Sequence, residues 1–380
     1  MTGTVNHVLD EAVASGKLVG AVVMAAKDGE VIYRRAAGLS DREAGTPMTE
    51  DTIFRAASLT KPLVASTLLA MEDAGLVQTD DPVTRYLPYF RPKLADGSEP
   101  VITLKHLLTH TAGLLYDYTA KDPRVTGGLV NADIHLDELL PLLAAQELSY
   151  APGTSWFYSM AIDVIGGIVA KVHGGRLREA VAHYVTGPLA MKDTDFVVRD
   201  RRRLAVPYGD GEDMPVRMGE PHSVKNPWGG VTTFSPERIF NEKAFECGGG
   251  GMATTAPDFM RFLNAILGGG GPILKPETAK KAMRDQMGYE REPGQAFSFL
   301  GSYTVDPQRA DLYWPAGTNN WGGIYGHIWS MDPVNRICMV SLSNTAFYGG
   351  ELAFPRALRK AVYAEFALSN SDFSGHKIGL

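Results

Sequence analysis

Phe54-Arg-Ala-Ala-Ser58-Leu-Thr-Lys61-Pro-Leu63 places a serine three residues before a lysine, where an apolar run at residues 62–75 begins. If that run is a helix, Ser58 and Lys61 lie at its start, about one turn apart on the same face. Unpaired N–H groups and the positive end of the helix dipole favour negative charge that develops on a serine oxygen there. A lysine one turn away can take the hydroxyl proton if it is held neutral. The stretch predicts a nucleophilic serine; an N-cap serine followed by a solvated lysine is the alternative.

A serine followed by a lysine at this spacing is a weak signal by itself, because such pairs arise by chance. Ser374-Gly-His-Lys377 is a second match, in a polar tail with Gly375 inside it. We expect that second pair to have no function. The rest of the chain must therefore decide whether the pair at Ser58 is functional.

Length and composition indicate a globular protein of one large domain or two. The chain has 380 residues, of which 44% are hydrophobic and 21% are charged, as is ordinary for a globular protein. Its net charge of −6 argues against nucleic acid as a partner. The basic run at residues 199–203 is expected to be solvated surface.

Motifs for metals, cofactors and export are missing from the sequence. Cys247 and Cys338 are too few for a disulfide framework and have no neighbour at metal-ligand spacing. No glycine-rich nucleotide-binding pattern opens a helix. The N-terminus lacks a signal-peptide pattern, and no apolar run reaches the roughly 18 residues that a membrane span needs. We therefore expect no metal, no cofactor, no membrane association and a cytoplasmic location; the oligomeric state is left open.

The order of expected elements places strands at both ends of the chain and helices between them. Apolar runs at 21–26 and 31–36 flank Asp28-Gly29, a hairpin signal. Further strands are expected at 324–331 and 336–343, whereas residues 198–251 lose periodicity and indicate a functional loop or poorly packed surface. Helical periodicity is found at residues 5–16, 62–75, 103–111, 136–148, 161–172, 177–185, 257–267 and 355–368.

This order predicts an α/β (α+β) fold, with one antiparallel sheet made from both termini, flanking helices and an inserted, mainly helical domain. The expected domains are 1–65 together with 225–380 for the sheet and 66–224 for the helical insertion.

An activated serine needs a base, and the sequence favours lysine and tyrosine over histidine. No Gly-x-Ser-x-Gly pattern occurs, which counts against an α/β-hydrolase. Tyr158 follows the Pro152-Gly153 turn and comes just before an expected helix, where a loop can present a site residue. A tyrosine in the core is the alternative.

Six short motifs, in order, resemble the landmarks of the serine β-lactamase/penicillin-binding-protein superfamily, and most of all its class C-related (family VIII) carboxylesterases. The resemblance covers nearly the whole chain and implies a sheet domain with an inserted helical domain and the active site in the cleft between the two. The motifs lie at residues 54–63, 110–114, 151–159, 188–194, 248–255 and 321–333.

The resemblance implies roles for individual residues. Ser58 would be the nucleophile, and Lys61 and Tyr158 would share the base and acid roles, without a decision between them. The backbone N–H groups of Ser58 and Ile324, the latter on the strand after Gly323, would form the oxyanion hole. Substrate-binding positions would be Tyr116, Trp321, Gly322, Gly323 and His327, with a structural role as the alternative for His327 and a surface position as that for Tyr116.

Two departures from the β-lactamase pattern favour neutral esters as substrates. The second motif of class C enzymes is Tyr-x-Asn, whereas this chain has Tyr158-Ser159-Met160 and lacks the amide. Where β-lactamases have Lys-Thr-Gly, this chain has Trp321-Gly322-Gly323, as in the esterases. The lysine that would hold a β-lactam carboxylate is thus replaced by an apolar wall.

The sequence therefore predicts a serine hydrolase acting on short-chain carboxylic esters through an acyl-enzyme. Its partner would be a small-molecule ester or amide. The alternatives on the same scaffold are a D-amino-acid amidase or peptidase, an amide hydrolase, and an acyltransferase. A true β-lactamase and a covalent sensor protein that cannot deacylate are less favoured.

Overall fold

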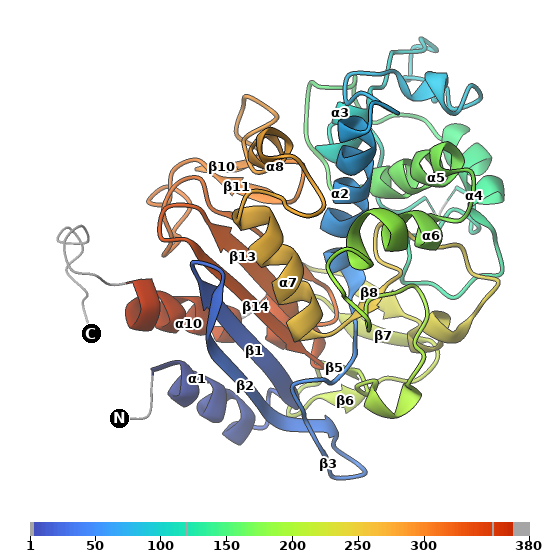
Figure 1. Ribbon diagram of the computed structural model, residues 1–380. Helices are drawn as coiled ribbons and strands as arrows, with labels where there is room; N and C mark the ends of the chain where they lie inside the picture. Colours follow the sequence, from blue (N-terminus) through green and yellow to red (C-terminus); the bar gives the residue numbers. More distant parts are fainter. Residues whose placement is uncertain (1–3, 119–120, 352, 368–380) are drawn as a thin grey trace.

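The fold is built on one eight-stranded antiparallel sheet (Figure 1). The structure is a computed structural model, which describes residues 4–118, 121–351 and 353–367. The sheet joins strands from both ends of the chain, which confirms the expected fold class. Across the sheet the strands are β10 (Gln295–Phe297), β11 (Ser302–Thr304), β12 (Asn319–Gly323), β13 (His327–Asp332), β14 (Ile337–Ser343), β1 (Gly20–Lys27), β2 (Glu30–Asp41) and β3 (Thr46–Pro47).

The central strand β1 is buried on both faces. Its turn to β2 uses Asp28 and Gly29 at φ values of 52° and 84°, the left-handed conformation that short hairpin turns require. On its other edge, β1 pairs antiparallel with β14, with Val22 opposite Leu342. Side chains alternate along β1: Ala21, Val23 and Ala25 face one apolar cluster, and Val22, Met24 and Ala26 face another.

Helices cover both faces of the sheet. On one face, α1 (Thr4–Ala14) and α10 (Ala353–Val362) pack side by side and bury Leu9 and Leu358 against β1. On the other face, α7 (Ala256–Leu267) lies across β1 and β14 (Figure 1). The N-cap of α7 is Thr255, whose hydroxyl accepts from the N–H of Asp258.

A second group of helices lies beside the sheet, at the upper right of Figure 1. At its centre is α2 (Thr60–Asp73), which is buried at every position from Thr60 to Met71. A helix that is buried all round belongs in the middle of a core, and α5 and α6 pack against it. Besides α5 (Ala161–His173) and α6 (Leu177–Val181), the group contains α3 (Leu104–Leu108) and α4 (Leu136–Ala144). The remaining helices are α8 (Pro276–Ala282), which contacts α2, and α9 (Ala346–Gly350), which packs against β13 and β14.

The irregular stretch at 198–251 contains short antiparallel strand pairs that were not predicted from its sequence. β5 (Tyr208–Gly209) pairs with β6 (Val216–Arg217), and β7 (His222–Lys225) pairs with β8 (Val231–Phe234). The expected domain boundary between 224 and 225 falls inside β7, so the division into domains stays a prediction. Single-turn 3₁₀ or π segments occur at Ala57–Leu59, Val83–Arg85, Ala182–Thr186, Arg201–Arg203, Pro236–Phe240 and Tyr363–Ala367.

The expected strand at 324–331 is wrong at its start. β12 ends at Gly323 and β13 begins at His327, so Ile324 lies in the turn between them. Gly326, at φ 107°, closes this turn, and its N–H donates to the carbonyl of Gly323 at 2.8 Å. Leu368, the last residue of the expected final helix, and the Ser374/Lys377 pair lie outside the described residues.

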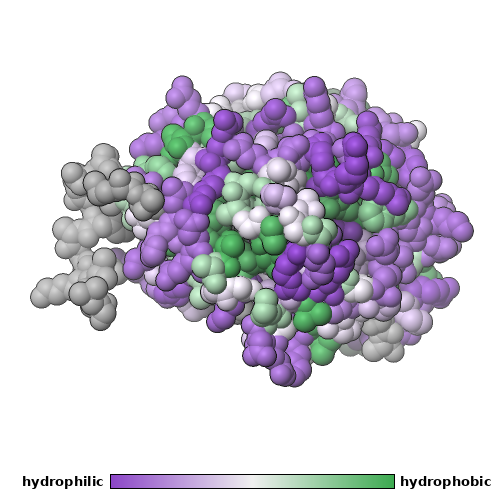
Figure 2. Space-filling model, turned by 90° about the horizontal axis from the view of Figure 1, so that it is seen from below, coloured by the Kyte–Doolittle hydropathy of each residue, from purple (hydrophilic) through white to green (hydrophobic). Residues whose placement is uncertain are grey.

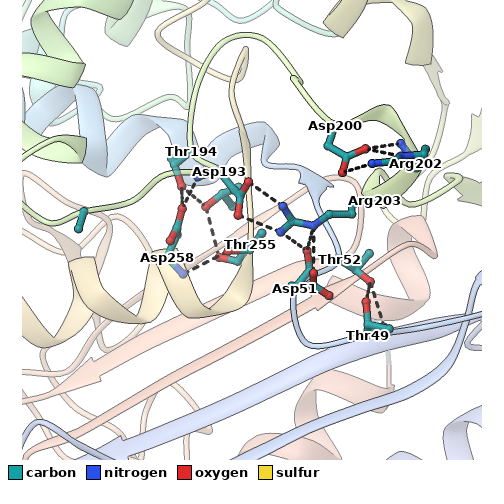
Figure 3. A network of polar contacts seen from close by, with 12 residues as sticks. Thr49, Asp51, Thr52, Asp193, Thr194, Asp200, Arg202, Arg203, Thr255 and Asp258 are labelled. Atoms are coloured by element: carbon teal, nitrogen blue, oxygen red, sulfur yellow. Dashed lines mark hydrogen bonds and ion pairs between the residues drawn. The ribbon is translucent and has the colours of Figure 1, made fainter.

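A polar network joins the segment after α6 to the segment that leads to Ser58 (Figure 3). The guanidinium of Arg203 binds both carboxylate oxygens of Asp193 at 2.9 and 2.8 Å and donates to the carbonyl of Asp51 at 3.0 and 2.6 Å. Asp258 of α7 accepts from the N–H of Asp193 and from Thr194. The basic run is therefore only partly solvated: the Arg202 side chain is 91% exposed and that of Arg203 only 28%.

We expect replacement of Arg203 by methionine to lower the free energy of unfolding by about 1–2 kcal/mol, because paired carboxylate and carbonyl groups lose their donor. Denaturant unfolding followed by circular dichroism measures the change. Arg202→Met is the matched control, since the ion pair of Arg202 with Asp200 is at the surface; its effect should stay within about 0.5 kcal/mol. Equal stability of the Arg203→Met variant and the parent would contradict this role.

The surface is mixed in character. Seen from below, one face is mostly hydrophilic, with hydrophobic residues gathered near its middle (Figure 2). Across the described ranges, no helix is both long enough and apolar enough to cross a membrane.

Candidate active site

Ser58 lies in a constrained turn between a two-stranded sheet and the start of α2. β4 (Phe54–Arg55) pairs with β9 (Ala253–Thr254) and leads into this turn. Ala57 has φ 46°, a left-handed conformation that costs a residue with a Cβ on the order of 1–3 kcal/mol. The N-cap of α2 is Leu59, and Lys61 is 5% exposed. The alternative of an N-cap serine with a solvated lysine is therefore wrong.

Two side chains reach the Ser58 hydroxyl. The Tyr158 hydroxyl donates to Ser58 Oγ at 2.7 Å, and Lys61 Nζ donates to the same oxygen at 3.2 Å. Tyr158 comes from the loop before α5, and Ser58 and Lys61 come from the start of α2. The structure thus brings together the three residues that the sequence selects.

Lys61 is held by a backbone carbonyl and by two aromatic rings. Nζ donates to the carbonyl of Gly249 at 2.6 Å and lies 4.5 Å from the ring centroid of Tyr158 and 5.4 Å from that of Tyr116. The N–H of Gly249 donates in turn to the buried carboxylate of Asp163 at 3.1 Å. A Cβ on Gly249 would lie 2.8 Å from that carboxylate, so glycine is required at this contact.

His110 holds the Tyr158 loop in place. Its Nδ1 accepts from the N–H of Ser159 at 3.2 Å and lies 3.1 Å from Ser159 Oγ. Its carbonyl accepts from Phe157 N–H and from the Tyr150 hydroxyl. Burial, together with the charges of Lys61 and Arg291, keeps the pKa of His110 well below its usual value. A neutral ring can accept at Nδ1, so this environment supports the contact.

Aromatic side chains surround the Tyr158 hydroxyl. Tyr116 stacks on Tyr158, with ring centroids 5.4 Å apart and planes 9° from parallel. Trp321 Nε1 donates to the Tyr158 hydroxyl at 3.2 Å. Trp156 and Phe297 both pack edge-on against Trp321. Burial raises the pKa of Tyr116 well above its usual value, so Tyr116 stays a neutral wall residue.

The β12–β13 turn approaches the Ser58 turn closely. A Cβ on Gly323 would lie 2.8 Å from the carbonyl oxygen of Ala56 and 3.0 Å from Leu59, and one on Gly322 would lie 2.7 Å from the carbonyl of His327. Both glycines are thus required by close packing within the protein. This packing also brings Ile324, the next residue, to the neighbourhood of Ser58.

The contacts of His327 do not support a place for it among the substrate-binding residues. Its Nε2 donates to the carbonyl of Arg55 at 2.8 Å, and its Nδ1 accepts from the N–H of Ser343 at 3.3 Å. Both ring nitrogens are used by the backbone, and burial lowers the pKa of His327 to about 4. His327 fastens β13 to the segment that precedes Ser58.

Several residues at the site were not selected from the sequence. Asp163 lies five residues after Tyr158 inside an apolar helix, where a lone buried carboxylate is the signal. Trp156 lies two residues before Tyr158, within the motif at 151–159, although it was not selected there. Arg291, in an irregular segment, and Phe297, at the end of the three-residue strand β10, have no local pattern that links them to Ser58.

A sheet flanked by helices, with a serine at the start of a buried helix and a lysine and a tyrosine at its hydroxyl, defines the class of serine hydrolases with a β-lactamase fold. The sequence model of the family described as Beta-lactamase matches residues 5–364. The chain belongs to this family, which confirms the resemblance drawn from its motifs.

Similar proteins include esterases. Esterase EstB of Burkholderia gladioli is 44% identical over 380 residues, covering 96% of this chain and 95% of that protein. Lovastatin esterase of Penicillium rubens is 26% identical over 367 residues, covering 87% of this chain and 89% of that protein. The solved structure of EstCE1, a hydrolase with promiscuous acyltransferase activity, has a TM-score of 0.92 and 36% identity, and covers 95% of this chain and 97% of that one.

Proposed function

We propose that this chain is a carboxylesterase that hydrolyses short-chain esters through an acyl-enzyme on Ser58. The observation that carries the proposal is the pair of contacts at Ser58 Oγ, at 2.7 Å from Tyr158 and 3.2 Å from Lys61. Trp321 supports an ester over a β-lactam, since its indole stands where β-lactamases have a lysine. The names of the similar proteins EstB and EstCE1 support the same activity.

In the first half of the reaction, Ser58 Oγ attacks the ester carbonyl carbon and its proton passes to the Tyr158–Lys61 pair. One member of the pair must be deprotonated for this step. Collapse of the tetrahedral intermediate breaks the bond to the alcohol oxygen, which takes the proton back from the pair. In the second half, water loses its proton to the pair and attacks the acyl-enzyme. Collapse of this second intermediate breaks the bond to Ser58 Oγ, which takes the proton back from the pair as the acid is released.

The oxyanion would be bound by the backbone N–H groups of Ser58 and Ile324. The turn positions of both residues support this assignment, and two preorganised donors typically contribute about 10²–10³ in rate each. The strained conformation of Ala57 holds the first donor in place. Tyr116 and Trp321 would line the space for the substrate, a small neutral ester. The cytoplasmic location stays a prediction.

Steady-state hydrolysis of p-nitrophenyl acetate, butyrate and octanoate, measured beside nitrocefin, tests the proposal. We expect turnover of the short esters and little of nitrocefin. Faster turnover of nitrocefin would favour a β-lactamase. A single burst equal to the enzyme concentration, without a steady state, would favour a covalent sensor. No release from any ester would shift the assignment to the amide hydrolases and D-amino-acid amidases of the same scaffold.

Acyl transfer to an alcohol is a second candidate activity. The aromatic rings of Tyr116, Trp156 and Trp321 around the Tyr158 hydroxyl favour it, because apolar walls bind the carbon chain of an alcohol better than they bind water. EstCE1 is described as having such activity. Adding an alcohol to the p-nitrophenyl butyrate assay and quantifying the new ester separates transfer from hydrolysis.

A further inference from the structure

Arg291 packs against the aromatic side chains beside Tyr158, which we call the aromatic wall. The wall consists of Tyr116, Trp156, Phe297 and Trp321. Arg291 belongs to the segment between α8 and β10, and its side chain is only 6% exposed. The central carbon of its guanidinium is 4.7 Å from the ring centroid of Trp156 and 5.4 Å from that of Trp321. A buried cation over two indole rings is in the geometry of a cation–π contact, which is strongest when water is excluded.

Hydrogen bonds and one ion pair hold the guanidinium of Arg291 in place. Nη2 donates to Gln295 Oε1 at 3.0 Å and to Ser302 Oγ at 3.1 Å, and Nη1 pairs with Glu292 at 3.0 Å. Gln295 and Ser302 belong to β10 and β11, which form an edge of the main sheet. The planar fork of arginine can make these bonds and still present its face to the rings, which an ammonium group cannot do.

The indole that Arg291 contacts acts directly on Tyr158. Trp321 Nε1 donates to the Tyr158 hydroxyl at 3.2 Å, and that hydroxyl is 2.7 Å from Ser58 Oγ. A donor aimed at the phenolic oxygen stabilises it whenever Tyr158 has given up its proton. A tilt of the indole would weaken this bond, so the orientation of Trp321 matters to the proton transfer.

We propose that Arg291 is a positioning residue for the esterase reaction, holding the Trp321 indole so that its N–H donates to Tyr158. The inference rests on the proposed function. Trp156 shares the cation with Trp321, and their rings lie at 73° to each other. Arg291 thereby links the edge of the sheet to the proton-transfer group without touching the reacting atoms.

The test is a double-mutant cycle on kcat for p-nitrophenyl acetate, the smallest substrate, because it depends least on the wall for binding. We expect Arg291→Met to lower kcat about tenfold and Arg291→Lys, which keeps the charge but loses the planar fork, to lower it about threefold. In the Trp321→Phe background, Arg291→Met should cause no further loss. Arg309→Met is the matched control: this arginine pairs with Glu290 near the surface, and its loss should leave kcat unchanged.

Each outcome bears on the proposal. An equal loss from Arg291→Met in both backgrounds, or an unchanged kcat in Arg291→Met, would overturn the role through Trp321. If Arg291→Met does not fold, Arg291→Lys carries the same cycle, and additivity there overturns the role. Parent enzyme without ester turnover, or turnover that persists in Ser58→Ala, would instead overturn the proposed function and remove the basis of this inference.

Discussion

Replacing Ser58 by alanine should lower ester hydrolysis by a factor on the order of 10⁴–10⁶, because the only route through an acyl-enzyme is lost and the remaining donors can only assist water. The measurement is kcat/KM for p-nitrophenyl butyrate. Covalent labelling by a fluorophosphonate should vanish in the same variant, since Ser58 carries the hydroxyl that Tyr158 and Lys61 both contact.

Ser66→Ala is the matched control for this substitution. Ser66 lies on the same helix, is fully buried, and its hydroxyl has no hydrogen-bond partner among the described residues. The control removes a buried hydroxyl from α2 without touching the site, so activity and labelling should match the parent. Labelling that persists in Ser58→Ala would place the nucleophile elsewhere in the chain.

Tyr158→Phe should lower kcat about 10²–10⁴-fold, the usual contribution of a positioned proton-transfer group. The change removes one oxygen and keeps the ring that stacks on Tyr116 and lies beneath the Lys61 cation. KM should change far less than kcat, because the wall keeps its shape. Pre-steady-state release of p-nitrophenol measures the acylation step directly.

The matched control for Tyr158→Phe is Tyr33→Phe, which also removes a hydrogen-bonded phenol hydroxyl and keeps the ring. The Tyr33 hydroxyl donates to Asn6, between β2 and α1. Its loss should leave kcat within a factor of about two. If Tyr158→Phe also kept kcat near the parent value, Lys61 alone would carry the proton, and the proposed sharing of roles would be wrong.

The sequence predicted the parts of the fold that local patterns encode. Asp28-Gly29 indicates the first hairpin, and apolar periodicity indicates α2, α5 and α7 to within a few residues. β10 and β11 were not predicted, because strands of three residues carry no usable alternation. Ile324 was placed on a strand, since its apolar side chain continues a strand-like run, whereas Gly326 forces a turn there.

The same distinction holds for the site: residues marked by a local motif could be predicted, and residues placed by tertiary packing could not. Ser58 and Lys61 are close in sequence, and a motif can report their geometry. Tyr158 could be selected only because the proline and glycine before it mark a loop and because the motif order resembles a known superfamily. Arg291, in an irregular segment, and Phe297, on β10, reach the aromatic side chains around Tyr158 only through tertiary packing, which a single sequence does not show.

The pairing of β1 with β14 also affects how the chain can fold during synthesis. Val22 reaches its partner Leu342 only after nearly the whole described chain has been translated. Until then the hairpin of β1 and β2 has an open edge and two apolar faces, which is the kind of surface on which aggregation begins. The sheet around β1 can thus be completed only late in synthesis, and we expect ribosome-bound chains that stop before β14 to depend on chaperones.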